Sequence, residues 1–460
     1  MDLRAKLARL RTMEPPAGLF EPPPPSAAAE SRVLHDAGGF GRALTSLGDK
    51  TERIAHLRAL ISEVAARDRK RAPLPAAVEP AQPPWQTQET PHGVLHVHER
   101  YLEPDHHHGR AAVAAGLCTR PAALCALLRD ASFGTLDLER ALYLDTETTG
   151  LAGGTGTVAF LVGLARFEAG SLCVEQLIVP QLGCETPVLG RLAERMAAAS
   201  CIVTYNGKSF DWPLLRTRFV LSRMPVPPLP PHIDLLHVCR RLWKPRLASL
   251  RLAEIEREIL RFEREDDLPG SEIPARYFEF LRGGSPDGLV PVLEHNQNDL
   301  IALSALLGAV QEQFEGARPL SDPLDALSFG RLALAAGDAL SAQTFAASAL
   351  EHSLQDKERF LALSFCSEVA RQRADTDQAI AFLKRALACA PSLLQRAAVH
   401  FRLAKLYEHE LGDMARALVH ARGTEPVEGA ALHGRRLGRL YRRLLRQPDA
   451  PAADGGGGGM

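Results

Sequence analysis

The stretch that decides the fold is ALYLDTETTG, residues 141–150, in which two acidic residues follow a short apolar run. The run ALYL is typical of a buried strand, and the glycine that ends the stretch breaks it. Asp145 and Glu147 are two residues apart, so both side chains point to the same side of an extended strand. Two such carboxylates repel each other unless a positive charge lies between them. The pair therefore indicates either a divalent metal site or two solvated acids in a turn.

The length and composition of the whole chain limit its number of domains and the classes of protein to which it can belong. Its 460 residues are enough for two or three domains. The 54 basic and 55 acidic residues nearly cancel, so any nucleic-acid-binding surface has to be local. The eight cysteines include no CxxC pair, which argues against a structural zinc site and a disulfide framework. No run is apolar enough for a membrane helix or a signal sequence. We therefore expect a soluble cytoplasmic protein with no membrane partner.

Four regions differ in composition along the chain. Residues 1–85 are rich in Pro and Ala, which predicts a mostly disordered N-terminal region with one possible helix. Residues 86–315 alternate short apolar strands with helices, a pattern typical of an α/β domain with a mixed sheet. Residues 320–447 are predicted to be helical, and residues 448–460 to be a flexible tail.

The helical region contains a short sequence that recurs at similar spacing. Its three copies are GDALSA (337–342), ADTDQA (374–379) and GDMARA (412–417). The middle unit resembles a tetratricopeptide repeat, and about three such units are needed for a stable array. The resemblance implies a protein partner for these repeats, although packing on the neighbouring domain also explains them. The last stretch, residues 433–446, has a leucine stripe with arginines around it. It is typical either of a helix that closes the array or of a nucleic-acid-binding surface.

Two further segments carry acidic residues at the ends of predicted elements. YNGKSFDWPLL (205–215) predicts a strand that leads into a helix, with Asp211 at the helix start. A carboxylate also favours the positive end of a helix dipole, which is the structural explanation of Asp211. LEHNQNDLIALSAL (293–306) predicts a helix on which His295 and Asp299 share one face. A lone His–Asp pair on a helix is more often a hydrogen-bonded surface pair than a catalytic one, so each segment alone is a weak signal.

Taken together and in this order, the three segments resemble the DEDD superfamily of 3′→5′ exonucleases, whose fold is ribonuclease H-like. Further segments narrow the resemblance to the YprB ribonuclease H-like group, over about residues 85–310. They are ETTGLAGGTGTVAFLVGL (147–164), IDLLHVCRRLW (233–243), DLPGSEIPARYFEFL (267–281) and VLEHNQNDLIAL (292–303). The resemblance implies a ribonuclease H-like mixed sheet flanked by helices, followed by tetratricopeptide-like repeats. It also implies a metal-dependent exonuclease that acts on the 3′ end of single-stranded DNA or RNA.

The resemblance further implies a role for each site residue. The ligands of two divalent ions, Mg²⁺ or Mn²⁺, would be Asp145, Glu147, Asp211 and Asp299, and the general base would be His295. Both ions prefer oxygen ligands. In this superfamily a His lies five residues before the last Asp, or a Tyr lies four residues before it. Here His295 lies four residues before Asp299, which rotates its side chain by about 100° around the helix relative to the usual His.

Candidate contacts to nucleic acid are polar and basic residues near the predicted site, namely Asn206, Lys208, Arg240, Arg241 and Lys244. A basic cluster can bind a phosphate backbone, although an ordinary solvated helix face explains the last three equally well. The six histidines between His92 and His108 are interpreted as strand and loop surface rather than a second metal site. The alternative function for the chain is a non-catalytic ribonuclease H-like scaffold, which binds nucleic acid or protein without turnover.

Overall fold

The computed structural model describes residues 83–117, 121–150, 156–352 and 354–446. The predicted disordered region up to residue 82 and the predicted flexible tail lie outside these residues. Within the described part, no helix is long and apolar enough to cross a membrane.

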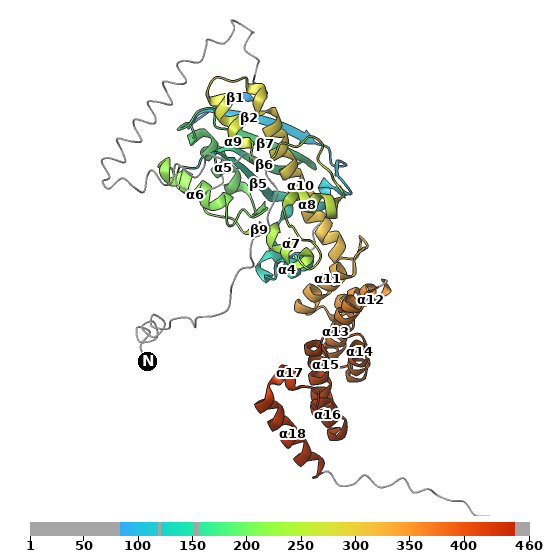
Figure 1. Ribbon diagram of the computed structural model, residues 1–460. Helices are drawn as coiled ribbons and strands as arrows, with labels where there is room; N and C mark the ends of the chain where they lie inside the picture. Colours follow the sequence, from blue (N-terminus) through green and yellow to red (C-terminus); the bar gives the residue numbers. More distant parts are fainter. Residues whose placement is uncertain (1–82, 118–120, 151–155, 353, 447–460) are drawn as a thin grey trace, which may run out of the picture. The chain divides into compact units, whose positions relative to one another are not determined.

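A seven-stranded mixed sheet forms the centre of the α/β part (Figure 1). Its strands, in spatial order, are β1 (Gln86–Thr90), β2 (Gly93–Leu102), β7 (Ser171–Ile178), β6 (Ala159–Glu168), β5 (Ala141–Thr148), β8 (Cys201–Thr204) and β9 (His232–Asp234). Neighbours from β1 to β5 are antiparallel, whereas β5, β8 and β9 are parallel. The carboxyl ends of these three strands therefore meet at one edge of the sheet. The mixed α/β fold predicted from the sequence is confirmed.

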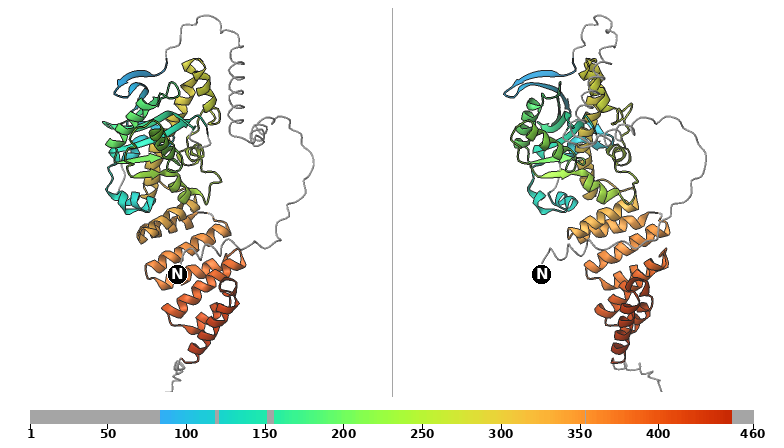
Figure 2. Two further views of the ribbon diagram at one scale, coloured as in Figure 1. Left: turned by 90° about the vertical axis from the view of Figure 1, so that its left-hand side faces the viewer. Right: turned by 60° about the vertical axis from the view of Figure 1, so that its left-hand side comes forward.

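Helices cover both faces of this sheet (Figure 2). They are α4 (Pro121–Leu128), α5 (Thr186–Ala198), α6 (Asp211–Leu221), α7 (Leu235–Trp243), α8 (Leu252–Ile255), α9 (Ile273–Leu281) and α10 (Val290–Phe314). Leu142 and Leu144 of β5 lie in one apolar core together with residues of α5 and α6. Tyr143 lies in a second core together with residues of α10 such as Leu300. Successive side chains of β5 thus alternate between the two faces, as extended backbone requires.

The region after residue 320 is entirely helical in its described part. Its helices are α11 (Pro323–Ala335), α12 (Ala339–Glu351), α13 (Asp356–Gln372), α14 (Thr376–Ala388), α15 (Leu393–Lys405), α16 (Met414–Ala421), α17 (Glu425–Glu428) and α18 (Ala430–Leu444). A further short helical turn, Leu406–Glu410, follows α15. The all-helical prediction is confirmed, whereas the tetratricopeptide assignment and the domain boundaries stay predictions.

The recurring sequence in this region marks the turn of each helical hairpin. The side chains of Asp338, Asp375 and Asp413 accept hydrogen bonds of 2.9, 3.0 and 2.8 Å from the backbone N–H three residues further on. Each aspartate therefore caps the second helix of a pair: α12, α14 or α16. The residue before each cap, either Gly or Ala374, has a positive φ that lets the chain reverse. The repeat in the sequence thus encodes a repeated turn.

The arginine-rich helix α18 is attached to the array through one buried carboxylate. The side chain of Glu408 is completely buried and forms ion pairs with Arg436, Arg439 and Arg443 at 3.3, 2.9 and 3.2 Å. Burial would raise the pKa of Glu408, but hydrogen bonds and charge from Arg439 and Arg436 lower it. Residues 433–446 contain six arginines, and three of them therefore form ion pairs with Glu408. Such pairing is expected of a helix that closes the array.

A Glu408→Gln variant is expected to loosen α18. The loss in free energy of unfolding should be about 1–2 kcal/mol, between the values for exposed and buried pairs, because Arg439 and Arg443 are about half exposed. Hydrogen exchange of the α18 amides measures the effect directly. Glu410→Gln, an exposed glutamate two residues away, is the matched control and should change stability by less than about 0.5 kcal/mol. Equal exchange rates in both variants would contradict this attachment.

Candidate metal centre

The end of β5 carries two of the predicted carboxylates towards α10. Asp145 and Glu147 follow Tyr143 at intervals of two residues, so they lie on the same side of the sheet as Tyr143, which shares a core with Leu300 of α10. Both are partly buried. Thr146 lies between them and points to the opposite side, where the first residue of α6 is found. The strand thus places polar groups on both of its faces at the same edge of the sheet.

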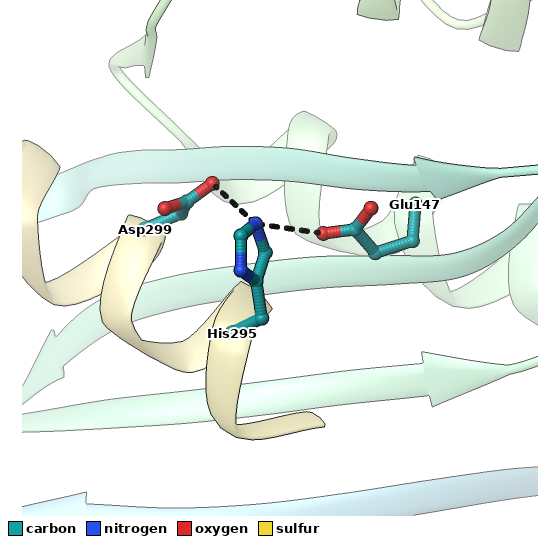
Figure 3. A group of neighbouring side chains, drawn as sticks. All are labelled: Glu147, His295 and Asp299. Atoms are coloured by element: carbon teal, nitrogen blue, oxygen red, sulfur yellow. Dashed lines mark ion pairs between the residues drawn. The ribbon is translucent and has the colours of Figure 1, made fainter. Parts of the chain in front are cut away.

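Helix α10 supplies an imidazole and a third carboxylate. His295 and Asp299 lie one turn apart and both face Glu147 (Figure 3). Nε2 of His295 lies 4.0 Å from Oε1 of Glu147 and 3.8 Å from Oδ2 of Asp299. One ligand atom from each of these three residues lies within 4.8 Å of the other two. The structure therefore brings three of the five predicted site residues into a group that could share one ion.

Asp145 is held by a buried amide that the sequence did not indicate. Nδ2 of Asn296 donates a hydrogen bond of 2.8 Å to Oδ2 of Asp145. Asn296 is completely buried, and its Oδ1 accepts a hydrogen bond of 2.9 Å from Nε2 of Gln176 on β7. Oε1 of Gln176 in turn lies 3.0 Å from Nδ1 of His98 on β2. A chain of three side chains thus runs from Asp145 across the sheet to a strand near its edge.

Asp211 approaches β5 from the opposite face. It is the first residue of α6 and is almost fully buried. Its Oδ1 accepts a hydrogen bond of 2.5 Å from Oγ1 of Thr146, the residue between the two carboxylates of β5. The predicted position at the start of a helix is confirmed. In this arrangement Asp211 contacts the strand through Thr146 rather than through the cluster of Glu147, His295 and Asp299.

The carboxylates repel one another strongly. Burial raises the pKa of Asp145 well above its usual value, and the charges of Asp299 and Asp211 raise it further. Burial and the charges of Asp145 and Asp299 do the same to the pKa of Glu147. Burial raises the pKa of Asp211 to about 6, despite the hydrogen bond from Thr146. For Asp299, burial raises the pKa, and the nearby guanidinium of Arg264 offsets part of that rise.

The set of donor atoms fits divalent cations. Carboxylate oxygens are the ligands that Mg²⁺ and Mn²⁺ prefer. Burial, together with the charges of the neighbouring carboxylates, disfavours the ionised forms of Asp145 and Glu147. A divalent cation would supply the missing positive charge. Oδ2 of Asp299 faces His295, while Oδ1 pairs with Arg264, so one oxygen of this carboxylate remains directed at the cluster.

Arg264 and its partners form an outer wall of the site that sequence reasoning missed. Besides its ion pair with Asp299, Arg264 lies 2.7 Å from Oε2 of Glu256. Burial would lower the pKa of Arg264, but Asp299 and Glu256 raise it. Glu256 is completely buried and lies 2.7 Å from Nε2 of His108. No sequence signal distinguished Arg264, because it lies in the charged run RFEREDD (261–267), which is typical of exposed surface.

The turn that contains Asn206 and Lys208 is bound to Asp234. The backbone N–H groups of Asn206 and Lys208 donate to the two oxygens of Asp234, at 2.8 and 3.2 Å. Oδ1 of Asp234 also accepts the N–H of Leu236 and so caps α7. Asp234 therefore acts as the N-cap of this helix and also fixes the preceding turn. Both backbone N–H groups donate to Asp234, so a contact with nucleic acid would have to involve the side chains of Asn206 and Lys208. The side chain of Lys208 is exposed.

The basic end of α7 is exposed. Its exposed residues are Arg240, Arg241 and Lys244. Nη1 of Arg241 donates to the carbonyl of Leu127 at 3.0 Å. Arg246, which follows, forms two hydrogen bonds of 3.0 Å with Asp325 of α11 and is structural. Trp243 is completely buried, so it packs in the core rather than stacking on a base.

Three of the six clustered histidines contact other side chains of the α/β part. His96 accepts a hydrogen bond from Trp85, while His98 contacts Gln176 and His108 contacts Glu256. Hydrogen bonding within the protein accounts for these three side chains.

Comparison with known proteins identifies the domain that carries the site. Residues 142–311 match the family model described as the RNase_H superfamily, and all five predicted site residues lie within that match. The chain is also 42% identical, over 166 residues, to "Uncharacterized protein YprB" of Bacillus subtilis (strain 168). That similarity covers 36% of this chain and 40% of the relative. The chain therefore contains an RNase H-like domain, and the matched family model ends before α11.

Proposed function

We propose that the chain is a metal-dependent 3′→5′ exonuclease that hydrolyses phosphodiester bonds of single-stranded DNA or RNA. The observation that carries the proposal is the cluster of Glu147, His295 and Asp299, with the mutually repelling carboxylates of Asp145 and Asp211 beside it. The match of residues 142–311 to the RNase_H superfamily supports the nuclease class. The direction of cleavage and the single-stranded substrate follow from the resemblance of the sequence motifs.

Each site residue has a task in this reaction. Asp145, Glu147, Asp211 and Asp299 would hold two divalent ions, Mg²⁺ or Mn²⁺. Bound there, the ions supply a water of lowered pKa and offset the charge on the phosphate. The tasks of orienting the substrate and moving the proton remain with the protein.

His295 is placed to take a proton from the attacking water. Its Nε2 faces the cluster, whereas its Nδ1 is directed at another carboxylate, that of Asp267. A neutral imidazole has one nitrogen with a proton and one with a lone pair. The nitrogen that faces Glu147 and Asp299 is therefore the one positioned to act as the base. The spacing of four residues to Asp299 does not turn this ring away from the cluster.

Contacts to substrate are proposed for exposed basic side chains outside the cluster. Lys208 follows β8 at the edge of the sheet where β5 also ends. Arg240, Arg241 and Lys244 of α7 form a separate basic surface, which would bind the strand through its phosphates. The helical region is proposed to bind a protein partner. It contains a cavity of about 530 Å³ whose lining includes Arg371, Arg402 and Lys405.

The experiment that tests the proposal measures nucleotide release from single-stranded DNA and RNA, labelled at the 3′ or the 5′ end. Wild type should release the 3′ label first in Mn²⁺ or Mg²⁺ and should be inactive in EDTA, because the carboxylates alone do not activate water. An Asp145→Asn variant tests for a contaminating nuclease. Binding that persists in EDTA without any release would contradict the exonuclease and support the scaffold alternative.

A further inference from the structure

Asp267 lies against His295 but belongs to none of the predicted site residues. Its Oδ1 is 2.8 Å from Nδ1 of His295. The other ring nitrogen, Nε2, faces Glu147 and Asp299 at 4.0 and 3.8 Å. The two nitrogens of one imidazole therefore have different neighbours, and Asp267 is the nearest partner of the nitrogen that faces away from the cluster.

Asp267 is itself fixed in place. Its second oxygen, Oδ2, lies 3.2 Å from Nη1 of Arg264. Arg264 is only 7% exposed, and it also pairs with buried Glu256 and with Asp299. One short segment thus holds two residues of α10, because Asp267 contacts His295 and Arg264 contacts Asp299 one turn further on. Such a carboxylate can orient a ring, because its own position is set by a second strong partner.

We propose that Asp267 is a positioning residue that accepts the Nδ1–H of His295 and so leaves the lone pair of Nε2 directed at the cluster. The inference rests on the proposed function, since it assigns a partner to the general base. In the step concerned, a proton passes from the attacking water to Nε2 and the electron pair of the O–H bond stays on oxygen. The Nδ1–H remains hydrogen-bonded to Asp267, which orients the resulting imidazolium and stabilises its charge.

The test compares Asp267→Asn with Asp266→Asn. The Asn amide can donate to Nδ1, which would place the proton on Nε2 and remove the base. Asp267→Asn is therefore expected to lower kcat by about 10²-fold or more with little change in KM. Asp266 is the matched control, because it is exposed and its φ of 52° suits Asn. The same chemical change one residue away should leave kcat unchanged.

A double-mutant cycle separates positioning from general damage. In a His295→Gln background, Asp267→Asn should cost nothing further, because residues that act as one unit are not additive. A second, equal loss in that background would mean that Asp267 acts elsewhere, and it would overturn the inference. So would equal kcat values for Asp267→Asn and Asp266→Asn.

The tautomer of His295 gives a readout that does not depend on activity. A long-range ¹H–¹⁵N spectrum of the wild type should show the proton on Nδ1, with the signal assigned by its loss in His295→Gln. A proton on Nε2 would overturn the inference, even if Asp267→Asn does not fold. If wild type shows the Nδ1–H form but releases no nucleotide, the exonuclease proposal fails while the hydrogen bond to Asp267 stands.

Discussion

An Asp145→Asn variant is expected to lose metal-dependent nucleotide release by about 10³-fold or more, yet to unfold at a higher temperature than wild type in the absence of metal. The activity falls because a neutral amide replaces a charged ligand beside the cluster of Glu147, His295 and Asp299, where metal and charge together contribute several kcal/mol. The shape is retained, and the amide oxygen can still accept the hydrogen bond that Asn296 donates to Asp145.

The gain in stability follows from the repulsion in the apo site. Burial and the charges of Asp299 and Asp211 raise the pKa of Asp145, so the folded protein holds this carboxylate less favourably than the unfolded chain does. Removing its charge should therefore increase the free energy of unfolding at neutral pH, by about 1 kcal/mol if the effect has the usual size for a single substitution. Thermal unfolding in EDTA measures the difference.

The sign of this gain also fixes its pH dependence. A carboxyl group whose pKa is raised in the folded protein destabilises the fold fully when the pH is above that raised pKa. The destabilisation disappears when the pH is below the pKa of the unfolded chain, which is 3.8. The advantage of Asp145→Asn over wild type should thus shrink as pH falls towards 4. Asp266→Asn, at an exposed position, should show neither the loss of turnover nor the gain. Retained turnover in Asp145→Asn would remove the exonuclease proposal.

A Gly163→Ala variant is expected to damage both the fold and the site. Gly163 is the cross-strand partner of Asp145 on β6. An added Cβ would lie 2.7 Å from Nδ2 and 2.8 Å from Cγ of Asn296, much closer than carbon and nitrogen normally approach. Because Asn296 is completely buried, it has to move and give up its bonds to Asp145 and Gln176.

The expected cost of Gly163→Ala is about 3 kcal/mol or more in free energy of unfolding, since overpacking and unpaired buried groups each contribute about 1–3 kcal/mol. Denaturant unfolding measures it, and nucleotide release should fall in parallel. Gly288→Ala is the control, because a Cβ there meets nothing within 4 Å. Its stability should change by less than about 0.5 kcal/mol. A stable, active Gly163→Ala variant would show that Asn296 does not need this space.

The elements that form the fold could be predicted because their signals are local. The strands β5 and β8 are short apolar runs, whereas α6 and α10 are segments of helix length. The lateral order of the strands in the sheet was not predictable, because the antiparallel pairing of β2 with β7 joins residues as remote in the sequence as His96 and Ile178. The alternation of β5 did indicate that Asp145 and Glu147 share a face.

The site divides in the same way. Strand periodicity indicated that Asp145 and Glu147 share a face, but their grouping with Asp299 rested on the resemblance of the three segments to a known superfamily. Asn296 was within the same quoted segment but carried no signal, since its role depends on the space left by a glycine on another strand. Arg264 and Asp267 were hidden for a further reason. Their segment has no regular period, so nothing local shows which helix it covers.

The aspartate caps of the helical hairpins bear on how that region folds. Each cap joins residues only three positions apart, so the turn that reverses the chain is specified before any distant contact forms. Structures built from such short-range contacts fold quickly, and their cooperativity passes from neighbour to neighbour. Heat or denaturant should therefore open this array from its free end, starting with α18. The α/β sheet, which depends on remote strand pairing, acquires its order more slowly than the helices that follow it.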